Sequence, residues 1–234
     1  MQLQATIESF YLHCRDKDAA DALVLFKASN LTHHIQYDEL KVRFPAVIFV
    51  EEVDFRMQVL SLIKRYEYVL FLVDDNIFVK PFSLGDCTAV LDSGKDAVGF
   101  SLCLGRNTDF CYSQNIPQKV PQFERIREGI FKYKWPGTEY DFGYPLEVSS
   151  SVYRSNEILH LLNQVEFSNP NTLKGEINRN TNNFVSKTPF LLTFEQSVTF
   201  SNPVNIVQCV YENNRYGKVQ KYCPKSWRTF SRVV

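Results

Sequence analysis

The chain has 234 residues, of which 44% are hydrophobic and 14% aromatic, a composition that excludes an intrinsically disordered protein and fits one folded domain with a sizeable core. Lysine plus arginine and aspartate plus glutamate number 26 each. This balance gives no bulk electrostatic basis for binding nucleic acid or an anionic membrane.

Cysteine spacing and hydropathy indicate the cellular compartment in which the protein is expected. The six cysteines are scattered without a Cys-x-x-Cys pair, which predicts reduced thiols. No apolar stretch approaches the roughly 20 residues that cross a bilayer, and the first residues do not have the pattern of a signal peptide. We therefore expect a soluble, cytoplasmic protein without a transmembrane segment.

Helices and strands are expected to alternate through the first part of the chain. The order is a helix over 2–14, strand 22–26, helix 37–43, strand 46–50, helix 55–66, strand 68–73, a helix capped by Ser83, and strand 97–102. Such alternation predicts an α/β fold with a mostly parallel sheet and right-handed crossovers. The first expected element is a helix, so the opening strand usual in such a fold is missing from the pattern.

The second part of the chain has a different pattern. We expect a long loop over 105–120, a strand over 146–153, a helix capped by Ser155, an Asn- and Thr-rich loop over 169–183, a strand over 190–194 and a basic tail from Arg215. No repeat or linker separates the parts. We therefore expect one domain over 1–234, either a whole protein or a fragment of a longer polypeptide.

Two adjacent carboxylates and an amide follow the most apolar strand. The run Tyr68 to Val73 ends in Asp74, Asp75 and Asn76. In open α/β sheets, ligands bind outside the carboxyl ends of the strands. Neighbouring carboxylates repel each other unless a cation lies beside them, and Mg²⁺ or Mn²⁺ prefers such oxygen ligands. This pattern predicts a divalent metal site, although Asp and Asn are also common in plain turns.

The strand-end motif, together with other segments, resembles a known family. The block Phe71 to Asn76 looks like the DxD-type motif of nucleotide-sugar glycosyltransferases with the GT-A fold. Segments 1–9, 26–29, 100–107, 141–146, 169–173 and 200–208 resemble a bacterial and large-virus branch of that family, of the chlorella-virus type. For a viral member, the cytoplasm would be that of the host.

The resemblance implies a metal-dependent hexosyltransferase. It would move a sugar from a nucleotide diphosphate sugar, with UDP as the expected nucleotide, to a hydroxyl of a glycan or glycoprotein. Residues 1–104 would bind the donor, and 105–234 would form the acceptor side and tail. The metal ligands would be Asp75, Asp74 and Asn76. The expected donor contacts are Lys27, Ala28, Ser29, Asp74, Asp75, Asn205, Gln208 and Arg215.

The catalytic base is the least determined part of this reading. An inverting transferase needs a carboxylate that deprotonates the acceptor hydroxyl. The family usually has an Asp-Gly-His-like triplet where this chain has 149–151, all serine, and a Glu where it has Lys174. The candidates are Glu176, Asp141 and Glu147, in that order. A retaining mechanism without such a base is the alternative.

The residues also bear on two other functions. A nucleotidyltransferase needs a Gly-rich basic loop near its N-terminus, and this chain has none. A non-catalytic module that holds a nucleotide sugar or glycan without turnover stays open as the alternative.

Overall fold

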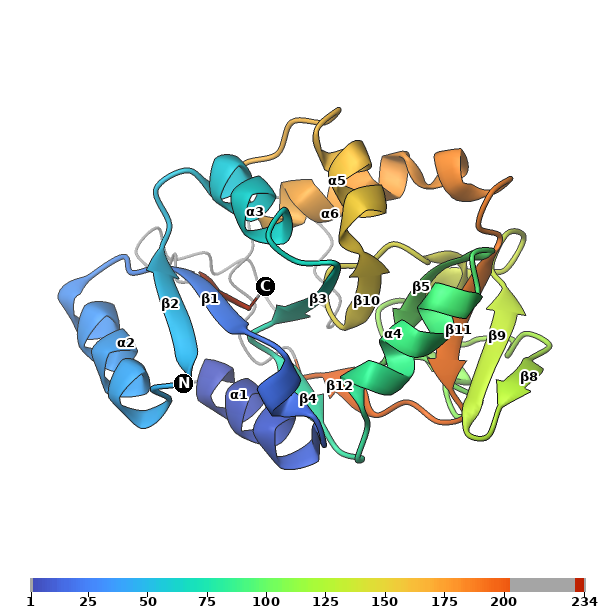
Figure 1. Ribbon diagram of the computed structural model, residues 1–234, viewed down its shortest axis with the longest axis horizontal. Coiled ribbons are helices and arrows are strands. Elements are labelled where there is room, and N and C mark those ends of the chain that lie inside the picture. Colours follow the sequence, from blue (N-terminus) through green and yellow to red (C-terminus); the bar gives the residue numbers. More distant parts are fainter. Residues whose placement is uncertain (1, 203–229, 234) are drawn as a thin grey trace.

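A nine-stranded sheet with helices on both faces forms the centre of the molecule (Figure 1). The computed structural model describes residues 2–202 and 230–233. The helices are α1 (Gln2–His13), α2 (Leu31–Arg43), α3 (Phe55–Ile63), α4 (Leu84–Ser93), α5 (Ser155–Leu162) and α6 (Pro170–Arg179), with short 3-10 helices at Lys17–Ala19, Tyr140–Gly143 and Thr181–Phe184. The four described cysteines form no disulfide.

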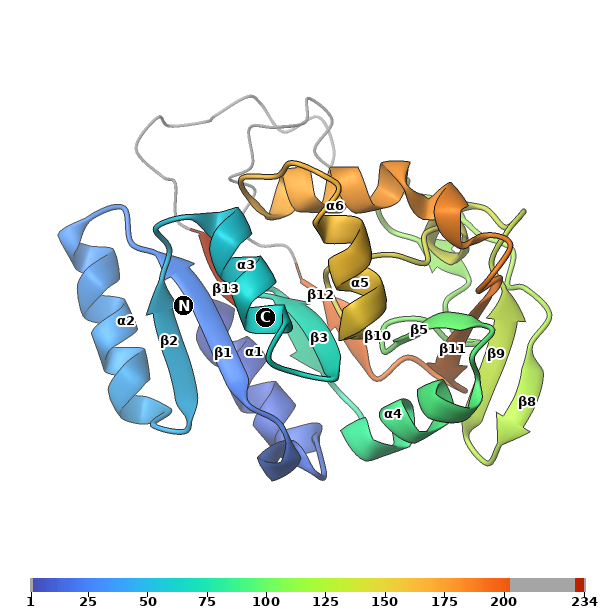
Figure 2. The same ribbon diagram turned by 45° about the horizontal axis from the view of Figure 1, so that its top comes forward.

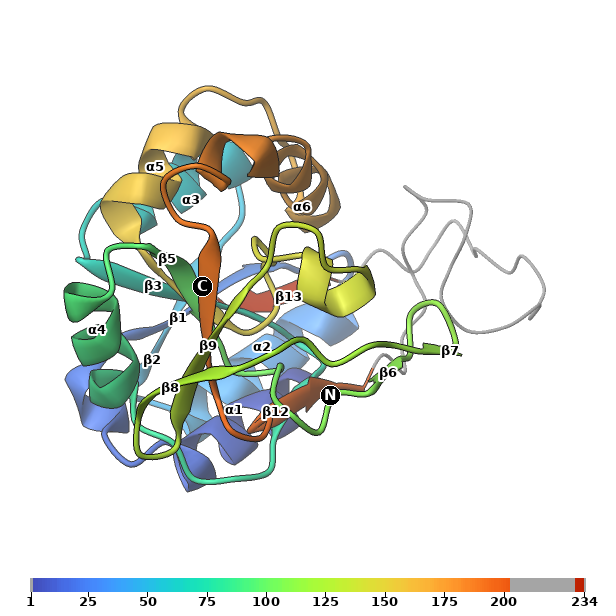
Figure 3. The same cartoon turned by 90° about the vertical axis from the view of Figure 1, so that its right-hand side faces the viewer.

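The sheet separates two hydrophobic cores, and Figure 3 shows the helices that cover its two faces. Helices α1, α2 and α4 pack on one face, and α3, α5 and α6 pack on the other. In strand β1 (Ala22–Lys27), Val24 contributes to the first core and Leu25 to the second. In strand β3 (Tyr68–Val73), Leu72 and Phe71 divide in the same way. Burial on both faces explains why these strands are continuous apolar runs.

The prediction of a mostly parallel sheet is wrong. The strand order is β2-β1-β13-β3-β10-β5-β11-β9-β8. Of its eight neighbouring pairs, only β1 with β2 (Val47–Glu51) and β5 (Ala97–Ser101) with β11 (Phe190–Phe194) are parallel. Strand β13 (Phe230–Val233) runs antiparallel between β1 and β3, and β10 (Ser151–Arg154) does so between β3 and β5 (Figure 2).

The strands after residue 104 extend the same sheet. Strands β8 (Glu124–Arg127) and β9 (Ile130–Lys134) form a hairpin whose turn contains Gly129 at φ +72°. Short strands β6 (Phe110–Cys111) and β7 (Ile116–Pro117) pair within the expected loop. Strands β4 (Asn76–Phe78) and β12 (Thr199–Ser201) form a small separate sheet.

Several element predictions in the second part need correction. The expected loop over 169–183 contains helix α6, which begins with an Asn169–Thr172 capping box and Pro170 in its first turn. Leu173 and Ile177, four residues apart, bury its inner face.

Three other elements also begin at residues that differ from the prediction. Strand β10 begins only at Ser151, and helix α5 begins without a side-chain cap from Ser155. Helix α2 begins six residues before its expected start, because Asn30 caps it.

Candidate active site

The acidic pair forms the tight turn between β3 and β4. Asp74 and Asp75 are half-buried and lie where β3 ends, as the sequence predicted. The hydroxyl of Thr6 donates a 2.8 Å hydrogen bond to the carbonyl oxygen of Asp74. The backbone N–H of Asn202 donates one of 2.8 Å to the carbonyl oxygen of Asp75. Helix α1 and the segment after β12 therefore fix the backbone that carries both carboxylates.

Asn76 is fully buried, and its side chain fixes the backbone of this turn through hydrogen bonds. Its side-chain oxygen accepts a 2.8 Å hydrogen bond from the N–H of Val73. Its side-chain NH₂ donates to the carbonyl oxygen of Ser149 at 2.8 Å and to the hydroxyl of Ser201 at 3.3 Å. These bonds give Asn76 a structural role and leave it poorly placed for the expected role of metal ligand.

The loop that Asn76 contacts is organised by a buried carboxylate, Glu147. One carboxylate oxygen of Glu147 accepts hydrogen bonds from the N–H of Ser149, at 2.5 Å, and from the Ser149 hydroxyl. The other oxygen accepts from the hydroxyl of Ser151 at 2.6 Å. Between these serines, Ser150 has φ +145°, a backbone conformation that non-glycine residues rarely adopt. The serine triplet therefore forms a constrained corner beside the acidic turn.

Asp141 lies near the same corner. Gln118, which is buried, donates from its side chain to the Asp141 carboxylate at 3.3 Å and accepts from the Asp141 N–H at 3.2 Å. Burial raises the pKa of the Cys103 thiol to about 12, and the negative charge of Glu147 adds to this, with a smaller effect from Asp141. The charges of Glu147 and Asp141, two of the three candidate bases, therefore both act on the Cys103 thiol.

Glu176, the first candidate base, lies on helix α6. It forms an ion pair with Arg179 one turn later, and its carbonyl oxygen accepts a hydrogen bond from Asn180. The side chain of Glu176 is 24% exposed. The α6 backbone contacts the segment around Asp141, because the hydroxyl of Tyr144 donates to the carbonyl oxygen of Lys174 at 3.2 Å. The segments of Glu147 and Asp141 therefore lie near the carboxyl ends of β3 and β5, and α6 contacts the Asp141 segment through Tyr144.

The expected donor contacts at the end of β1 lie one strand away from the acidic turn, because β13 separates β1 from β3. Lys27 is largely exposed, with its ammonium 3.9 Å from the carboxylate of Glu52. The hydroxyl of Ser29 lies 2.9 Å from Nδ1 of His33, and Ala28 lies between Lys27 and Ser29. Asn205, Gln208 and Arg215 lie outside the described residues.

The turn could hold a divalent cation only if other groups, such as substrate phosphates and water, supplied most of its ligands. Among residues 2–202 and 230–233, no three His, Cys, Asp or Glu side chains gather into a closed metal site. Asp74 and Asp75 supply two carboxylates on one fixed turn. Mg²⁺-type sites commonly use one or two carboxylates and take their remaining ligands from substrate phosphates and water. The donor set therefore suits a cation that arrives with a phosphate ligand.

Sequence reasoning missed the residues that hold the turn. Thr6, Asn202 and Ser149 contact the turn or the Asn76 side chain that holds it, and they carry ordinary polar side chains at positions without a motif. The serine triplet stood out only as a departure from the family pattern, and nothing in the sequence linked it to Asn76.

Comparisons with known proteins complete this description. The chain is 30% identical over 182 residues to the bifunctional glycosyltransferase pgtA of Dictyostelium discoideum, an alignment that covers 70% of this chain and 24% of the relative. The chain thus spans about a quarter of the length of the curated relative that it matches. No family model matches the chain.

Among solved structures, apo UDP-glucose pyrophosphorylase shows a weak likeness to this chain. The TM-score is 0.36 at 10% sequence identity, over 74% of this chain and 64% of that chain. A TM-score this low shows neither a shared fold nor a shared function. In the described part of the chain, no helix is both long and apolar enough to span a bilayer. The sequence match alone relates this chain to a known protein: the chain is similar to one part of a bifunctional glycosyltransferase.

Proposed function

We propose that this chain is a glycosyltransferase domain of the hexosyl-transferring type. The observation that carries the proposal is its 30% identity, over 182 residues, to part of a bifunctional glycosyltransferase. The fixed acidic turn at the end of β3 supports it, since ligands of α/β sheets bind outside strand ends. The donor is a nucleotide diphosphate sugar, with UDP as the first nucleotide to test, and the acceptor is a glycan or glycoprotein hydroxyl.

In this proposal the acidic turn binds the donor, and the residues around it keep the turn in place. Asp75 and Asp74 would hold Mn²⁺ or Mg²⁺, with the donor diphosphate as a further ligand. When bound, such a cation offsets the negative charge on the departing nucleoside diphosphate. Thr6, Asn202 and Asn76 keep the turn in place, so that the carboxylates need not reorganise when the donor binds.

The acceptor hydroxyl loses its proton to a carboxylate if the reaction inverts the sugar configuration. Glu176 stays the first candidate because it is partly exposed, whereas Glu147 is buried and accepts three hydrogen bonds. Asp141 accepts from Gln118 and stays the second candidate.

The decisive experiment measures donor binding and donor cleavage together. The purified chain is titrated with UDP in the presence of Mn²⁺ by calorimetry, and a panel of nucleotide sugars is assayed for release of free nucleoside diphosphate. Saturable, Mn²⁺-dependent binding with release supports a transferase. Absence of both UDP binding and release from every donor would refute it.

The hydrogen bonds of the candidate bases favour one alternative, a non-catalytic nucleotide-sugar or glycan-binding module. Glu176 is paired with Arg179, and the Glu147 carboxylate is occupied by serine donors. Such a module would bind a donor without releasing nucleoside diphosphate, even when candidate glycan acceptors are added. The same paired assay therefore separates the two functions.

A further inference from the structure

A pocket of about 560 Å³ lies beside helix α5, at the end of the sheet opposite to the acidic turn. It is lined by α5 and the residue after it, by Lys95 in the turn before β5, and by residues 183–188, which precede β11. Strand β10 runs antiparallel to both β3 and β5, so the carboxyl ends of β3 and β5 lie together, and the start of β5 lies at the other end. We call this space the α5 pocket. Its volume suits a small molecule, since such sites measure roughly 300–1,000 Å³.

The floor of the α5 pocket is firmly held. Leu161 of α5 is buried in the second hydrophobic core, and Phe184 packs against the same core. The backbone N–H of Thr188 donates a 2.8 Å hydrogen bond to the carbonyl oxygen of Phe184. The indole N–H of Trp135 donates one of 2.8 Å to the carbonyl oxygen of Thr188. A ligand therefore meets a surface that is already formed, and little binding free energy is lost to ordering it.

Two exposed lysines give the α5 pocket a positive charge. Within the described part of the chain, neither Lys95 nor Lys187 forms an ion pair. The lining also includes the carboxylate of Glu157. Its oxygen lies 3.3 Å from the guanidinium of Arg154, which is buried and offsets its charge. The charges of the two lysines are therefore left for a ligand.

Amide side chains supply hydrogen-bonding groups to the same space. Asn156 lies in the first turn of α5, Gln164 follows that helix, and Asn183 lies in the 3-10 helix before β11. The side-chain oxygen of Asn156 accepts a 2.8 Å hydrogen bond from the N–H of Glu157, so its NH₂ group is the part that can donate to a ligand. Amides both donate and accept, as sugar hydroxyl groups do. The ring of Phe184 adds an apolar surface beside them, and this combination suits a sugar.

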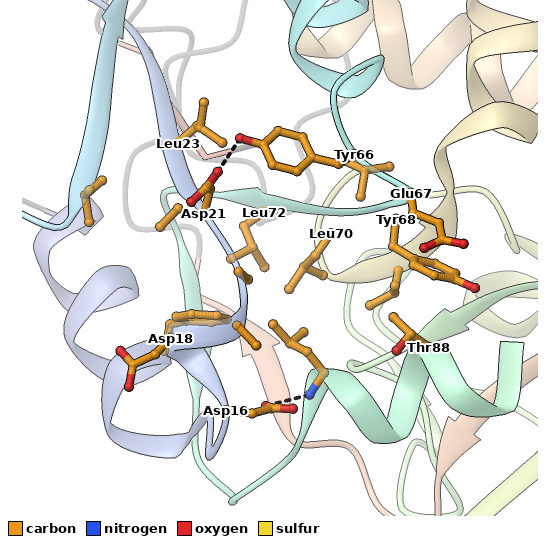
Figure 4. Close-up of a pocket in the computed structure, with 18 of the residues that line it drawn as sticks. Asp16, Asp18, Asp21, Leu23, Tyr66, Glu67, Tyr68, Leu70, Leu72 and Thr88 are labelled. Atoms are coloured by element: carbon orange, nitrogen blue, oxygen red, sulfur yellow. Dashed lines mark hydrogen bonds between the residues drawn. The ribbon is translucent and has the colours of Figure 1, made fainter. Parts of the chain in front are cut away.

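The charge of the α5 pocket contrasts with that of the space between β1 and β3 (Figure 4). Five carboxylates line that space, and none of the described residues that line it is a lysine or arginine. The five are Asp16, Asp18, Asp21, Glu67 and Asp92. An anionic ligand is therefore repelled from the space between β1 and β3 and attracted to the α5 pocket.

We propose that the α5 pocket binds a sugar phosphate. The phosphate pairs with Lys95 and Lys187, and the sugar hydroxyl groups bind the three amides of the lining. A lone phosphate fills only a small part of about 560 Å³, whereas a neutral sugar leaves both lysines unpaired. The chain as a whole has no net charge, so the two lysines do not belong to the broad basic surface that a nucleic acid requires. The site is separate from the proposed donor site at Asp74 and Asp75.

The test measures binding to the full chain in the presence of EDTA. EDTA removes divalent cations, so that a phosphate cannot bind at the acidic turn through a metal. Glucose 1-phosphate, glucose 6-phosphate and mannose 6-phosphate are titrated by calorimetry, with glucose and inorganic phosphate as the comparison ligands. Shifts of assigned backbone amide NMR signals locate the site. The comparison ligands separate recognition of the phosphate from recognition of the sugar.

At least one sugar phosphate is expected to bind about tenfold more tightly than glucose and about threefold more tightly than inorganic phosphate. Its titration should shift the amide signals of Lys95 and of residues 156–164 and 183–188. Failure of all three sugar phosphates to bind would overturn the proposal, as would signal shifts confined to other parts of the chain. Inorganic phosphate that binds as tightly as every sugar phosphate would show that no sugar is recognised, which also contradicts the proposal.

A pair of lysine variants with a matched control tests the charge of the α5 pocket. Lys95→Gln with Lys187→Gln removes both charges. Lys64→Gln with Lys134→Gln removes two exposed charges that lie outside the lining and form no ion pair in the described chain. The pocket pair should weaken binding of the sugar phosphate about tenfold at low salt, and the control pair should change it less than about twofold. Equal losses in the two pairs would count against the site.

A second measurement on the same variants keeps this proposal apart from the proposed transferase function. UDP binding in the presence of Mn²⁺ should be the same in the pocket pair and in the wild type. A loss of UDP binding in the pocket pair would assign the lysines to the donor site and overturn the proposal of a separate site. If the wild type binds no UDP, the proposed function fails, whereas binding of the sugar phosphate in EDTA still decides the role of the α5 pocket.

Discussion

The side-chain NH₂ of Asn76 donates a 2.8 Å hydrogen bond to the carbonyl oxygen of Ser149, and this bond ties the acidic turn to the loop before β10. Glu147 holds the same loop through the N–H and hydroxyl of Ser149. The turn that carries Asp74 and Asp75 is thus braced by a segment some 70 residues further along the chain. Packing and polar contacts from distant segments, rather than the turn itself, position the carboxylates.

Asn76→Ala is expected to destabilise the protein. The substitution leaves the buried N–H of Val73 and the carbonyl oxygen of Ser149 without their partner, which costs about 2–4 kcal/mol in the free energy of unfolding. Urea denaturation measures this change. Ser201→Ala removes only the longer 3.3 Å bond to Asn76 and should cost less than about 1 kcal/mol. A loss no larger than that of Ser201→Ala would show that the Asn76 bonds do not hold the turn.

Asp75→Asn is expected to weaken UDP binding in the presence of Mn²⁺ by more than about tenfold, because a metal ligand loses its charge while the shape of the side chain is kept. Calorimetry with and without Mn²⁺ checks this. Asp38→Asn, an exposed substitution on helix α2, is the matched control and should bind UDP as the wild type does. Unchanged Mn²⁺-dependent affinity in Asp75→Asn would remove Asp75 from the metal site.

Glu176→Gln should lower turnover by about 10²- to 10⁴-fold and leave UDP affinity unchanged, if Glu176 is the base. Glu147→Gln should instead lower the free energy of unfolding by about 1–3 kcal/mol, since an amide cannot accept all three hydrogen bonds of the Glu147 carboxylate. Measuring donor cleavage and urea stability on both variants separates the two roles. Wild-type turnover in Glu176→Gln would pass the role of base to Asp141.

Asp16 is expected to make stability depend on acid pH. Burial raises its pKa, but hydrogen bonds from the N–H groups of Gly85 and Leu84 and from the Ser83 hydroxyl outweigh this, so its pKa lies below the ordinary 3.8. A depressed pKa in the folded state stabilises the protein above the unfolded-state pKa, and this contribution disappears as pH falls through the folded-state value.

Asp16→Asn should therefore lower stability at pH 7 by about 1–2 kcal/mol, because the amide loses its charge at the start of helix α4. The difference from the wild type should shrink as pH drops below about 4. Urea denaturation at a series of pH values checks this. A difference that is constant from pH 7 to pH 2 would show that ionisation of Asp16 contributes nothing.

Much of the fold follows from local patterns in the first 104 residues. The strands β1, β2, β3 and β5 and the helices α3 and α4 agree with the prediction within a few residues, because apolar periodicity and caps such as Ser83 are local signals. Helix α2 also lies where a helix is predicted, but it begins six residues earlier. Helix α6 is not predicted, because Asn-rich segments are typical of loops, although Asn169 and Pro170 form a helix start signal. Strand direction was wrong because a buried strand has the same apolar run whether its neighbours are parallel or antiparallel.

The sequence by itself determined that Asp74 and Asp75 follow a strand buried on both faces, since six apolar residues in a row allow little else. Only the tertiary structure decided what surrounds that strand. Contacts between residues far apart in the chain, such as Asn76 with Ser149 and β13 with β1, have no local signature in the sequence.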